Sequence, residues 1–198
     1  MATTILNDAP SFNKSHSSQS LNNASLSTIQ EHPQIYVACL SSYTNGILYG
    51  AWIDATQLVE DIWVEIKQLL DNSPIPGAEE FTVHDFQGFG SLHIDEYESL
   101  KQIHEKAVFV VEHGHLGAEL AAYYGNLEEA EEALENHYMG VYSSELDYAI
   151  HLFDECYLHD IPESVQYYVD YDKFCRDIFI DSYFSIDIDG KTHVFARH

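Results

Sequence analysis

Basic side chains are scarce in this sequence. Eight of its 198 residues are lysine or arginine, against 33 aspartates and glutamates, and the formal net charge is -25. Between Lys106 and Lys173, 66 consecutive residues contain fifteen acids and neither lysine nor arginine. Because affinity for nucleic acids depends on basic contacts to phosphates, this composition argues against a nucleic-acid partner. A field of one sign also repels itself and opposes the compact state, which predicts that the charge serves a function.

Cysteines and long apolar runs are also few. Cys39, Cys156 and Cys175 are too scattered for a disulfide framework or a zinc site, so we expect reduced thiols that face the core. No run of about 18 apolar residues is present, which predicts no membrane span. The N-terminus lacks the basic segment and apolar run of a secretory signal. Together these absences predict a cytoplasmic protein.

Motifs for catalysis and for cofactor binding are missing as well. The sequence has no G-x-S-x-G nucleophile elbow, no helical H-x-x-x-H or H-E-x-x-H pair, and no phosphate-binding glycine loop. Its carboxylates are so numerous that no pair stands out as general acid and base, which need an unusual environment rather than abundance. We therefore expect a protein that is not an enzyme and that has no cofactor.

Metal binding is the strongest alternative function that the residues allow. Asp181, Asp187 and Asp189 precede Gly190, and such carboxylates could bind calcium. An EF-hand also needs a bidentate Glu at its twelfth position, whereas Gly190 is followed by KTHVFARH, which contains no Glu. A hairpin turn explains Asp189-Gly190 without a metal. An acidic, calcium-binding protein that responds to metal nevertheless stays open as an alternative.

The remaining composition predicts a folded protein. Hydrophobic residues make up 45% of the chain and aromatic residues 13%, whereas disordered acidic segments are poor in aromatics. Residues 1–34 differ, because they are rich in Ser and Asn and have no apolar period, so we expect a disordered tail there. That tail carries Asp8, Glu31 and Lys14, a net charge of -1, which leaves -24 on the other 164 residues.

Hydrophobic periodicity and turn residues predict the α+β class. Two strand-like runs flank Asn45-Gly46, which predicts a hairpin with a type I′ turn. Asp54 predicts the start of a helix, FTVHDF at residues 81–86 reads as a strand, and residues 97–139 have a largely helical pattern.

Further capping and turn residues divide the rest of the chain. Asn126 is expected to cap an acidic helix, and Ser143-Ser144 to cap another over residues 145–156. Two shorter helices are expected after Pro162 and over residues 171–180, and a final hairpin should turn at Asp189-Gly190. We expect two or three small modules with short antiparallel sheets and acidic helices. The boundaries predicted after the tail at 1–34 are an N-terminal α+β module at 35–98, a central helical module at 99–140 and a C-terminal α+β module at 141–198.

The net charge of the chain is large enough to imitate a stretch of duplex DNA. Duplex DNA carries one charge per roughly 1.7 Å of its axis, so about 24 charges match on the order of 40 Å of duplex, close to the diameter of a compact domain of this size. A coat of carboxylates that serves only solubility would have the same composition. Composition alone leaves both interpretations open.

Three segments resemble the ArdA antirestriction family. They are IYVACLSSYTNGILYGAWIDA, EEFTVHDFQGFGSLHIDEYESL and IPESVQYYVDYDKFCRDIFI, and the resemblance extends from about Ile35 to the C-terminus. It implies an elongated, three-module mimic of B-form DNA that dimerises. It also implies that the protein occupies the DNA-binding groove, in the methyltransferase core, of type I restriction-modification enzymes. The tail of 34 residues departs from the family pattern.

The resemblance also places candidate functional residues. Its antirestriction motif corresponds to AIHLFDECYLHDIP, residues 149–162, near the family's dimer contact, which suggests Ile150, Phe153 and Tyr157 for a homodimer interface. An inhibitor of some other basic DNA-binding protein would have the same physical character. The carboxylates that we expect to mimic DNA are Glu60, Asp61, Glu65, Asp95, Glu96, Glu98, Glu128, Glu129, Glu132, Glu135, Asp154, Glu155, Asp170, Asp172 and Asp177.

Overall fold

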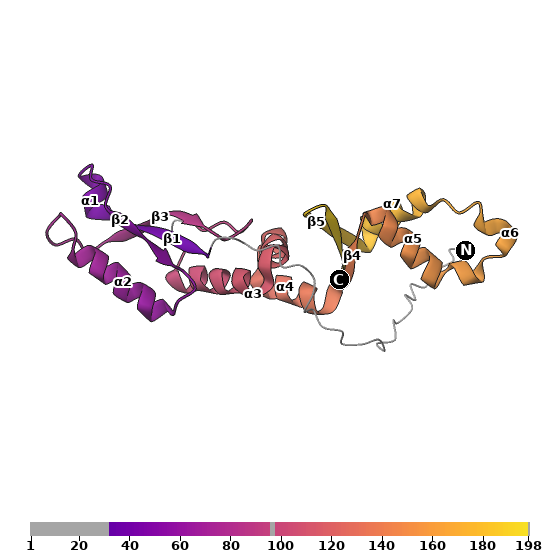
Figure 1. Ribbon diagram of the computed structural model, residues 1–198, viewed down its shortest axis with the longest axis horizontal. Coiled ribbons are helices and arrows are strands. Elements are labelled where there is room, and N and C mark those ends of the chain that lie inside the picture. Colours follow the sequence, from indigo (N-terminus) through magenta and orange to yellow (C-terminus); the bar gives the residue numbers. More distant parts are fainter. Residues whose placement is uncertain (1–31, 96–97, 198) are drawn as a thin grey trace, which may run out of the picture.

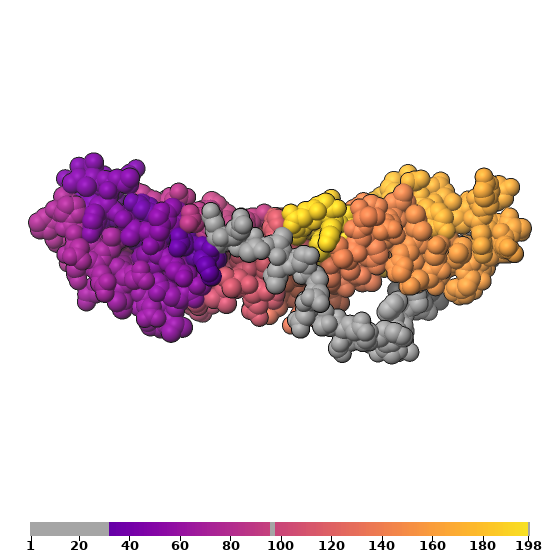
Figure 2. Space-filling model, viewed as in Figure 1, coloured from indigo at the N-terminus to yellow at the C-terminus, as the bar shows by residue number. Residues whose placement is uncertain are grey.

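The protein is elongated in the computed structural model, which describes residues 32–95 and 98–197 (Figures 1 and 2). The expected tail at residues 1–34 lies almost entirely outside the described residues. Within them the structure has seven α-helices and two three-stranded antiparallel sheets, so the predicted α+β class is confirmed. One sheet and helix α2 occupy one end of the molecule, helices α3 and α4 the middle, and helices α5 to α7 the other end (Figure 1).

The N-terminal sheet has the strand order β2-β1-β3. Strand β1, Gln34–Cys39, is central and pairs with β2, Gly50–Asp54, and with β3, Phe81–Gln87. The pairing of β1 with β3 shifts register after Tyr36, which is a β-bulge. The β-branched and aromatic residues of these runs form the strands that the sequence predicts.

The connection between β1 and β2 differs from the expected turn. Leu40–Thr44 forms the short helix α1, and Asn45 has a φ of -90°, whereas a type I′ turn needs positive φ at both central residues. The helix is anchored from a distance, because Ser42 Oγ lies 3.0 Å from Ser73 Oγ. Antiparallel pairing of the two strands is confirmed, but the predicted two-residue turn is wrong.

Helix α2, Val59–Asp71, buries Ile62 and Ile66 completely. The helix begins five residues after Asp54, so the predicted cap at Asp54 is wrong. The Asp54 carboxylate instead accepts a hydrogen bond from the backbone N–H of Thr56, at 2.8 Å, at the end of β2. Aspartate side chains readily form such local turns, which compete with helix capping.

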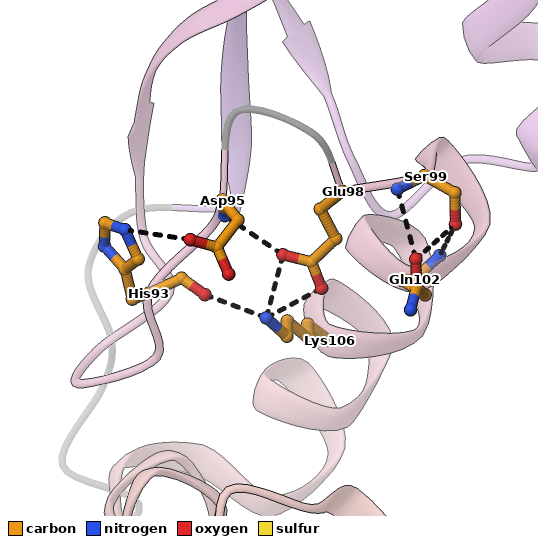
Figure 3. Close-up of polar contacts among 6 residues, drawn as sticks. All are labelled: His93, Asp95, Glu98, Ser99, Gln102 and Lys106. Atoms are coloured by element: carbon orange, nitrogen blue, oxygen red, sulfur yellow. Dashed lines mark hydrogen bonds and ion pairs between the residues drawn. The ribbon is translucent and has the colours of Figure 1, made fainter.

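Helix α3, Leu100–Tyr124, forms the middle of the molecule and is interrupted once. Gly114 has φ 64° and ψ -155°, outside the helical region, and divides the helix into two parts. This interruption lies within the largely helical pattern of residues 97–139. Ser99 and Gln102 form a reciprocal capping box at the N-terminal end (Figure 3).

The acidic helix that follows is shorter than predicted. Helix α4, Leu127–Glu132, is capped by Asn126 as expected, and a π-helical turn, Ala133–His137, follows it. Strand β4, Tyr138–Tyr142, then begins, so the helical prediction to residue 139 is wrong at its end. The expected module boundary at residue 140 lies inside β4.

The C-terminal sheet has the strand order β4-β6-β5. Strands β5, Tyr183–Ile188, and β6, Lys191–Ala196, are joined by Asp189 and Gly190, whose φ values are 52° and 74°. Both central residues have positive φ, and the predicted hairpin is confirmed. Strand β6 also pairs with β4, which follows the acidic helix.

Helices α5, α6 and α7 occupy the end beyond the C-terminal sheet (Figure 1), with a 3₁₀ turn at Leu158–Asp160 between α5 and α6. Helix α5, Glu145–Cys156, is capped by Ser144 as predicted. A 3₁₀ turn, α6 at Glu163–Gln166 and α7 at Tyr171–Asp181 follow, in agreement with the two short helices expected there. Among the described helices, none has the length and apolar character needed to cross a membrane.

One apolar cluster connects the two sheets along the molecule. It extends from Ile35 in β1, through the buried face of α3, to Phe195 in β6. Between α3 and β5 the rings of Tyr123 and Phe184 stack with centroids 4.7 Å apart and an interplanar angle of 7°. Arg197 reinforces this contact, because its guanidinium donates to the Tyr123 hydroxyl at 3.2 Å and lies 5.5 Å from the Phe184 ring centroid.

Substitution of Gly114 by Ala should destabilise the protein more than substitution of Gly125 by Ala. Gly114 has a combination of φ and ψ that side chains rarely adopt, which costs about 1–3 kcal/mol. Gly125 has φ 69° and ψ 13°, a left-handed conformation that costs an alanine roughly 1 kcal/mol. Urea denaturation of the two variants would measure the difference, and equal losses would contradict a specific requirement at Gly114.

Candidate protein-binding surface

Carboxylates cover the described surface, and none of those described is buried. Asp54, Glu98 and Glu119 are half-buried, and the other described aspartates and glutamates are exposed. The exposed carboxylates therefore keep access to water or to a partner. This distribution is what the desolvation cost favours, since burial of a charge without a partner is costly.

Few of these carboxylates are neutralised within the chain. In residues 32–95 and 98–197, ion pairs with lysine or arginine involve Glu98, Glu105 and Asp177. Four more carboxylates lie within 4 Å of a histidine, which is charged only when protonated. The surface therefore offers many acidic groups that can accept hydrogen bonds from the basic side chains of another molecule.

Helix α2 places its three predicted carboxylates on the surface at one end of the molecule. Glu60 and Asp61 lie in the first turn, where the helix dipole favours negative charge, and both are exposed. Glu65 is exposed one turn later and accepts a hydrogen bond from Gln57 Nε2 at 2.7 Å. The buried residues Ile62 and Ile66 hold this acidic helix against the N-terminal sheet.

The middle of the molecule carries the second predicted group. Glu128, Glu129 and Glu132 are exposed on α4, and Glu135 is exposed in the π-helical turn. The opposite side of this segment buries Ala130 and Ala133 in the core. Burial of these small residues orients the glutamates toward solvent.

The third predicted group lies on helices α5 and α7. Asp154 and Glu155 are exposed near the end of α5, and the Tyr171 hydroxyl donates to Asp154 at 2.7 Å. This hydrogen bond raises the pKa of Tyr171. Asp170 caps α7 by accepting from the Lys173 backbone N–H at 3.0 Å, whereas Asp172 is exposed in its first turn. Asp177 is exposed and lies 3.3 Å from Arg176.

The segment between β3 and α3 contains the remaining predicted carboxylates, and Glu98 there is not freely exposed. The Lys106 ammonium lies 2.7 Å and 2.9 Å from the two Glu98 carboxylate oxygens (Figure 3). The Glu98 side chain is 9% exposed and that of Lys106 21%. Glu98 is therefore neutralised internally, and Glu96 lies outside the described residues.

The Lys106–Glu98 pair also holds the backbone that carries Asp95. Lys106 Nζ donates to the His93 carbonyl at 2.8 Å, and Glu98 accepts from the Asp95 backbone N–H at 3.1 Å. The Asp95 carboxylate itself is exposed and lies 3.7 Å from His93 Nε2. One lysine thus fixes the polypeptide on both sides of this acidic turn. Sequence reasoning missed this role, although Lys106 is the last base before the long acidic stretch.

The residues suggested for a dimer contact lie on and after helix α5. Ile150 and Tyr157 have relative exposures of 36% and 44% and are available to another molecule. Phe153 is half-buried, and its ring packs against those of Tyr157, Tyr171 and Phe174. Phe153 therefore contributes to contact between α5 and α7 within one chain.

Two other features bear on alternative functions. An open cavity of about 600 Å³ lies near the N-terminal sheet, lined mainly by apolar residues such as Trp63, Phe81 and Leu100. In the part of the chain that the structure describes, no group of three or more His, Cys, Asp or Glu residues is arranged to hold a metal. Of the aspartates considered for calcium, Asp187 accepts from Thr192 Oγ1 at 2.7 Å and Asp189 forms the hairpin turn.

Sequence comparison identifies one family. The model of a family described as antirestriction protein (ArdA) matches residues 35–190. This range includes the N-terminal sheet apart from Gln34, and strands β4 and β5 of the C-terminal sheet, but not β6. It also includes all of the exposed acidic groups described above. A search of curated proteins finds no match to the chain.

Replacement of Lys106 by Met should destabilise the protein by about 2–3 kcal/mol, because Glu98 would keep a largely buried charge without its partner. The control is Lys101→Met, which removes the same formal charge from an exposed pair with Glu105 and should cost less than about 0.5 kcal/mol. Adding Glu98→Gln to Lys106→Met should recover part of the loss. Equal unfolding free energies for the two single lysine variants would contradict this role for Lys106.

Proposed function

The chain belongs to the ArdA antirestriction family, and from that premise we propose that it inhibits type I restriction-modification enzymes by occupying their DNA-binding groove. Exposed carboxylates would take the place of DNA phosphates. The observation that carries the proposal is a surface of acids that, among the residues the structure describes, almost entirely lack lysine or arginine partners. A groove that binds DNA is lined with Lys and Arg, which such a surface would satisfy.

The shape of the molecule supports the same proposal. The acidic groups follow one another from α2, through α4, to α5 and α7, and these elements lie in that order along the long axis (Figure 1). An extended array can contact a groove along its length, whereas a compact globule presents its charges to all sides. The charge of about -24 outside the tail corresponds to on the order of 40 Å of duplex.

The rigid positions of the carboxylates favour tight binding. Most of the proposed acids lie on helices whose opposite faces are packed against apolar residues, so their backbone is ordered before a partner binds. Such preorganisation lowers the entropy that association costs. DNA releases its own condensed counterions when a protein binds it. A protein mimic competes instead through the positions and charges of its carboxylates.

We propose that the protein acts as a binding inhibitor, without catalysis, and as a homodimer. The exposed side chains of Ile150 and Tyr157 would contribute to the contact between copies, with Phe153 supporting Tyr157 from within the chain. A dimer would double both the charge and the length of the acidic array. An acidic inhibitor of another basic DNA-binding protein remains the alternative that the experiment below distinguishes.

Competition with duplex DNA for a purified type I methyltransferase tests the proposal. The protein should displace DNA, and amide replacements at eight exposed carboxylates should weaken this inhibition on the order of 100-fold, from a few tenths of a kcal/mol for each exposed ion pair. The positions to replace are Glu60, Asp61, Glu128, Glu129, Glu132, Glu135, Asp154 and Glu155.

The control for this experiment exchanges Asp and Glu at the same eight positions, which keeps every charge. This variant should inhibit nearly as well as the original protein. Undiminished inhibition by a folded amide variant would overturn the electrostatic account. Failure of the original protein to displace DNA, combined with tight binding to another basic DNA-binding protein, would favour the alternative target.

Salt should have opposite effects on the free protein and on its complex. Between about 0.01 M and 0.1 M salt the Debye length falls from about 30 Å to about 10 Å, which screens repulsion within the chain and attraction to the partner alike. The melting temperature of the free protein should therefore rise while the affinity for the methyltransferase falls. The eight-amide variant should show a smaller rise, and a melting temperature of the original protein that is independent of salt would contradict the prediction.

A further inference from the structure

Two adjacent tyrosines at the α6 end of the molecule have almost no cover from the chain. Tyr167 is 92% exposed and Tyr168 is 78% exposed, the two highest values among the large hydrophobic residues described. They directly follow α6, at the end opposite to α2 (Figures 1 and 2). Their two rings contact each other edge to face, with centroids 5.7 Å apart. Large exposed aromatic groups of this kind are typical of binding sites.

The backbone around these tyrosines is ordered although their side chains are exposed. Tyr168 N–H donates to the Val165 carbonyl at 2.9 Å, and Val169 N–H donates to the Gln166 carbonyl at 3.2 Å. The Gln166 side chain crosses to the preceding turn and donates to the Ile161 carbonyl at 3.0 Å. The backbone that carries both rings is therefore ordered by hydrogen bonds within the chain, which lowers the entropy that binding costs.

Acidic residues outnumber basic ones around the tyrosines, by four to one between residues 160 and 173. Asp160, Glu163, Asp170 and Asp172 flank the tyrosines in the sequence, and all four are exposed. The first base after Lys106 is Lys173. An aromatic ring attracts a cation to its face, and a guanidinium both stacks on rings and pairs with carboxylates. Exposed aromatic rings flanked in the sequence by exposed carboxylates thus match the chemistry of arginine better than that of lysine.

We propose that Tyr167 and Tyr168 form an arginine-binding tip, at which an arginine of the basic partner stacks on a tyrosine ring and pairs with a neighbouring carboxylate. This inference rests on the proposed function, because the partner is the same basic protein. It adds a specific contact to an otherwise distributed electrostatic interaction. The ring contact would also persist at salt concentrations that screen the exposed charges.

A second copy of the chain is a poor occupant for the same tip. Each copy carries a formal charge of -25, and the tip would meet another acidic surface. The residues suggested for the dimer contact lie on and after α5, whereas the tyrosine pair follows α6. Charge complementarity therefore favours a basic protein over self-association at this position.

The decisive variants differ only in the side chains of the two tyrosines. Tyr167→Leu with Tyr168→Leu keeps apolar groups but removes the aromatic faces, whereas Tyr167→Phe with Tyr168→Phe keeps the rings. Against a purified type I methyltransferase, the leucine variant should bind about tenfold or more weakly, as expected for loss of a binding hot spot. The phenylalanine variant should stay within about threefold of the original protein, and the loss in the leucine variant should persist at high salt.

A second measurement does not depend on the proposed target. Binding of the original protein to a nonaarginine peptide and to a nonalysine peptide compares two cations of equal formal charge. The original protein and the phenylalanine variant should prefer the arginine peptide, and the leucine variant should lose that preference while it still binds the lysine peptide. If the original protein fails to bind the methyltransferase but retains this preference, the proposed target fails and the arginine-binding tip stands.

Three results would overturn the arginine-binding tip. One is equal binding of both peptides by the original protein, and another is an unchanged preference in the leucine variant. The third is a change of oligomeric state in the leucine variant, measured by analytical ultracentrifugation, which would place the tyrosines between copies of the chain. Circular dichroism of both variants would verify that the α6–α7 end remains folded.

Discussion

A thin, continuous apolar core has to hold together a chain whose charges repel one another. The formal charge of -25 opposes compaction, and self-repulsion weakens as charges separate. The fold is long, and apolar contacts extend along it from Ile35 to Phe195. The stacked rings of Tyr123 and Phe184 join α3 to the C-terminal sheet. Acids in the first turns of α2, α4 and α5 also interact favourably with the helix dipoles. The extended shape therefore places charges of one sign farther apart than a compact shape of the same chain would.

Most of the described acids can bind a partner, because the few lysines and arginines pair with only three of the carboxylates. Lys106 binds the largely buried Glu98 and the backbone around Asp95, so its charge supports the fold. Arg197 likewise contacts the Tyr123 hydroxyl and the Phe184 ring at the junction of α3 with β5. Bases placed at structural junctions contribute to stability and leave most exposed carboxylates unpaired. An antirestriction protein that competes with DNA would benefit from both consequences.

Local signals in the sequence predicted elements well where neighbouring residues determine the structure. The hairpin at Asp189-Gly190 and the helix caps at Asn126 and Ser144 agree with the structure, because each depends on hydrogen bonds or backbone angles within a few residues. The turn at Asn45-Gly46 was predicted wrongly, since the preceding residues form a helix anchored through Ser73, 31 residues away from Ser42. The acidic helix ends early for a similar reason, because β4 pairs with the distant strand β6.

Composition was sufficient to indicate a folded, strongly acidic protein without an evident catalytic motif, and three sequence segments were sufficient to indicate its family. Neither could distinguish Glu98 from the exposed glutamates, because its burial and its pairing with Lys106 depend on how the β3–α3 connection folds onto α3. Nor could the sequence distinguish the exposed rings of Tyr167 and Tyr168 from the half-buried ring of Phe153, since all belong to aromatic-rich segments. Exposure is a property of packing between distant parts of the chain, and residue type constrains it only weakly.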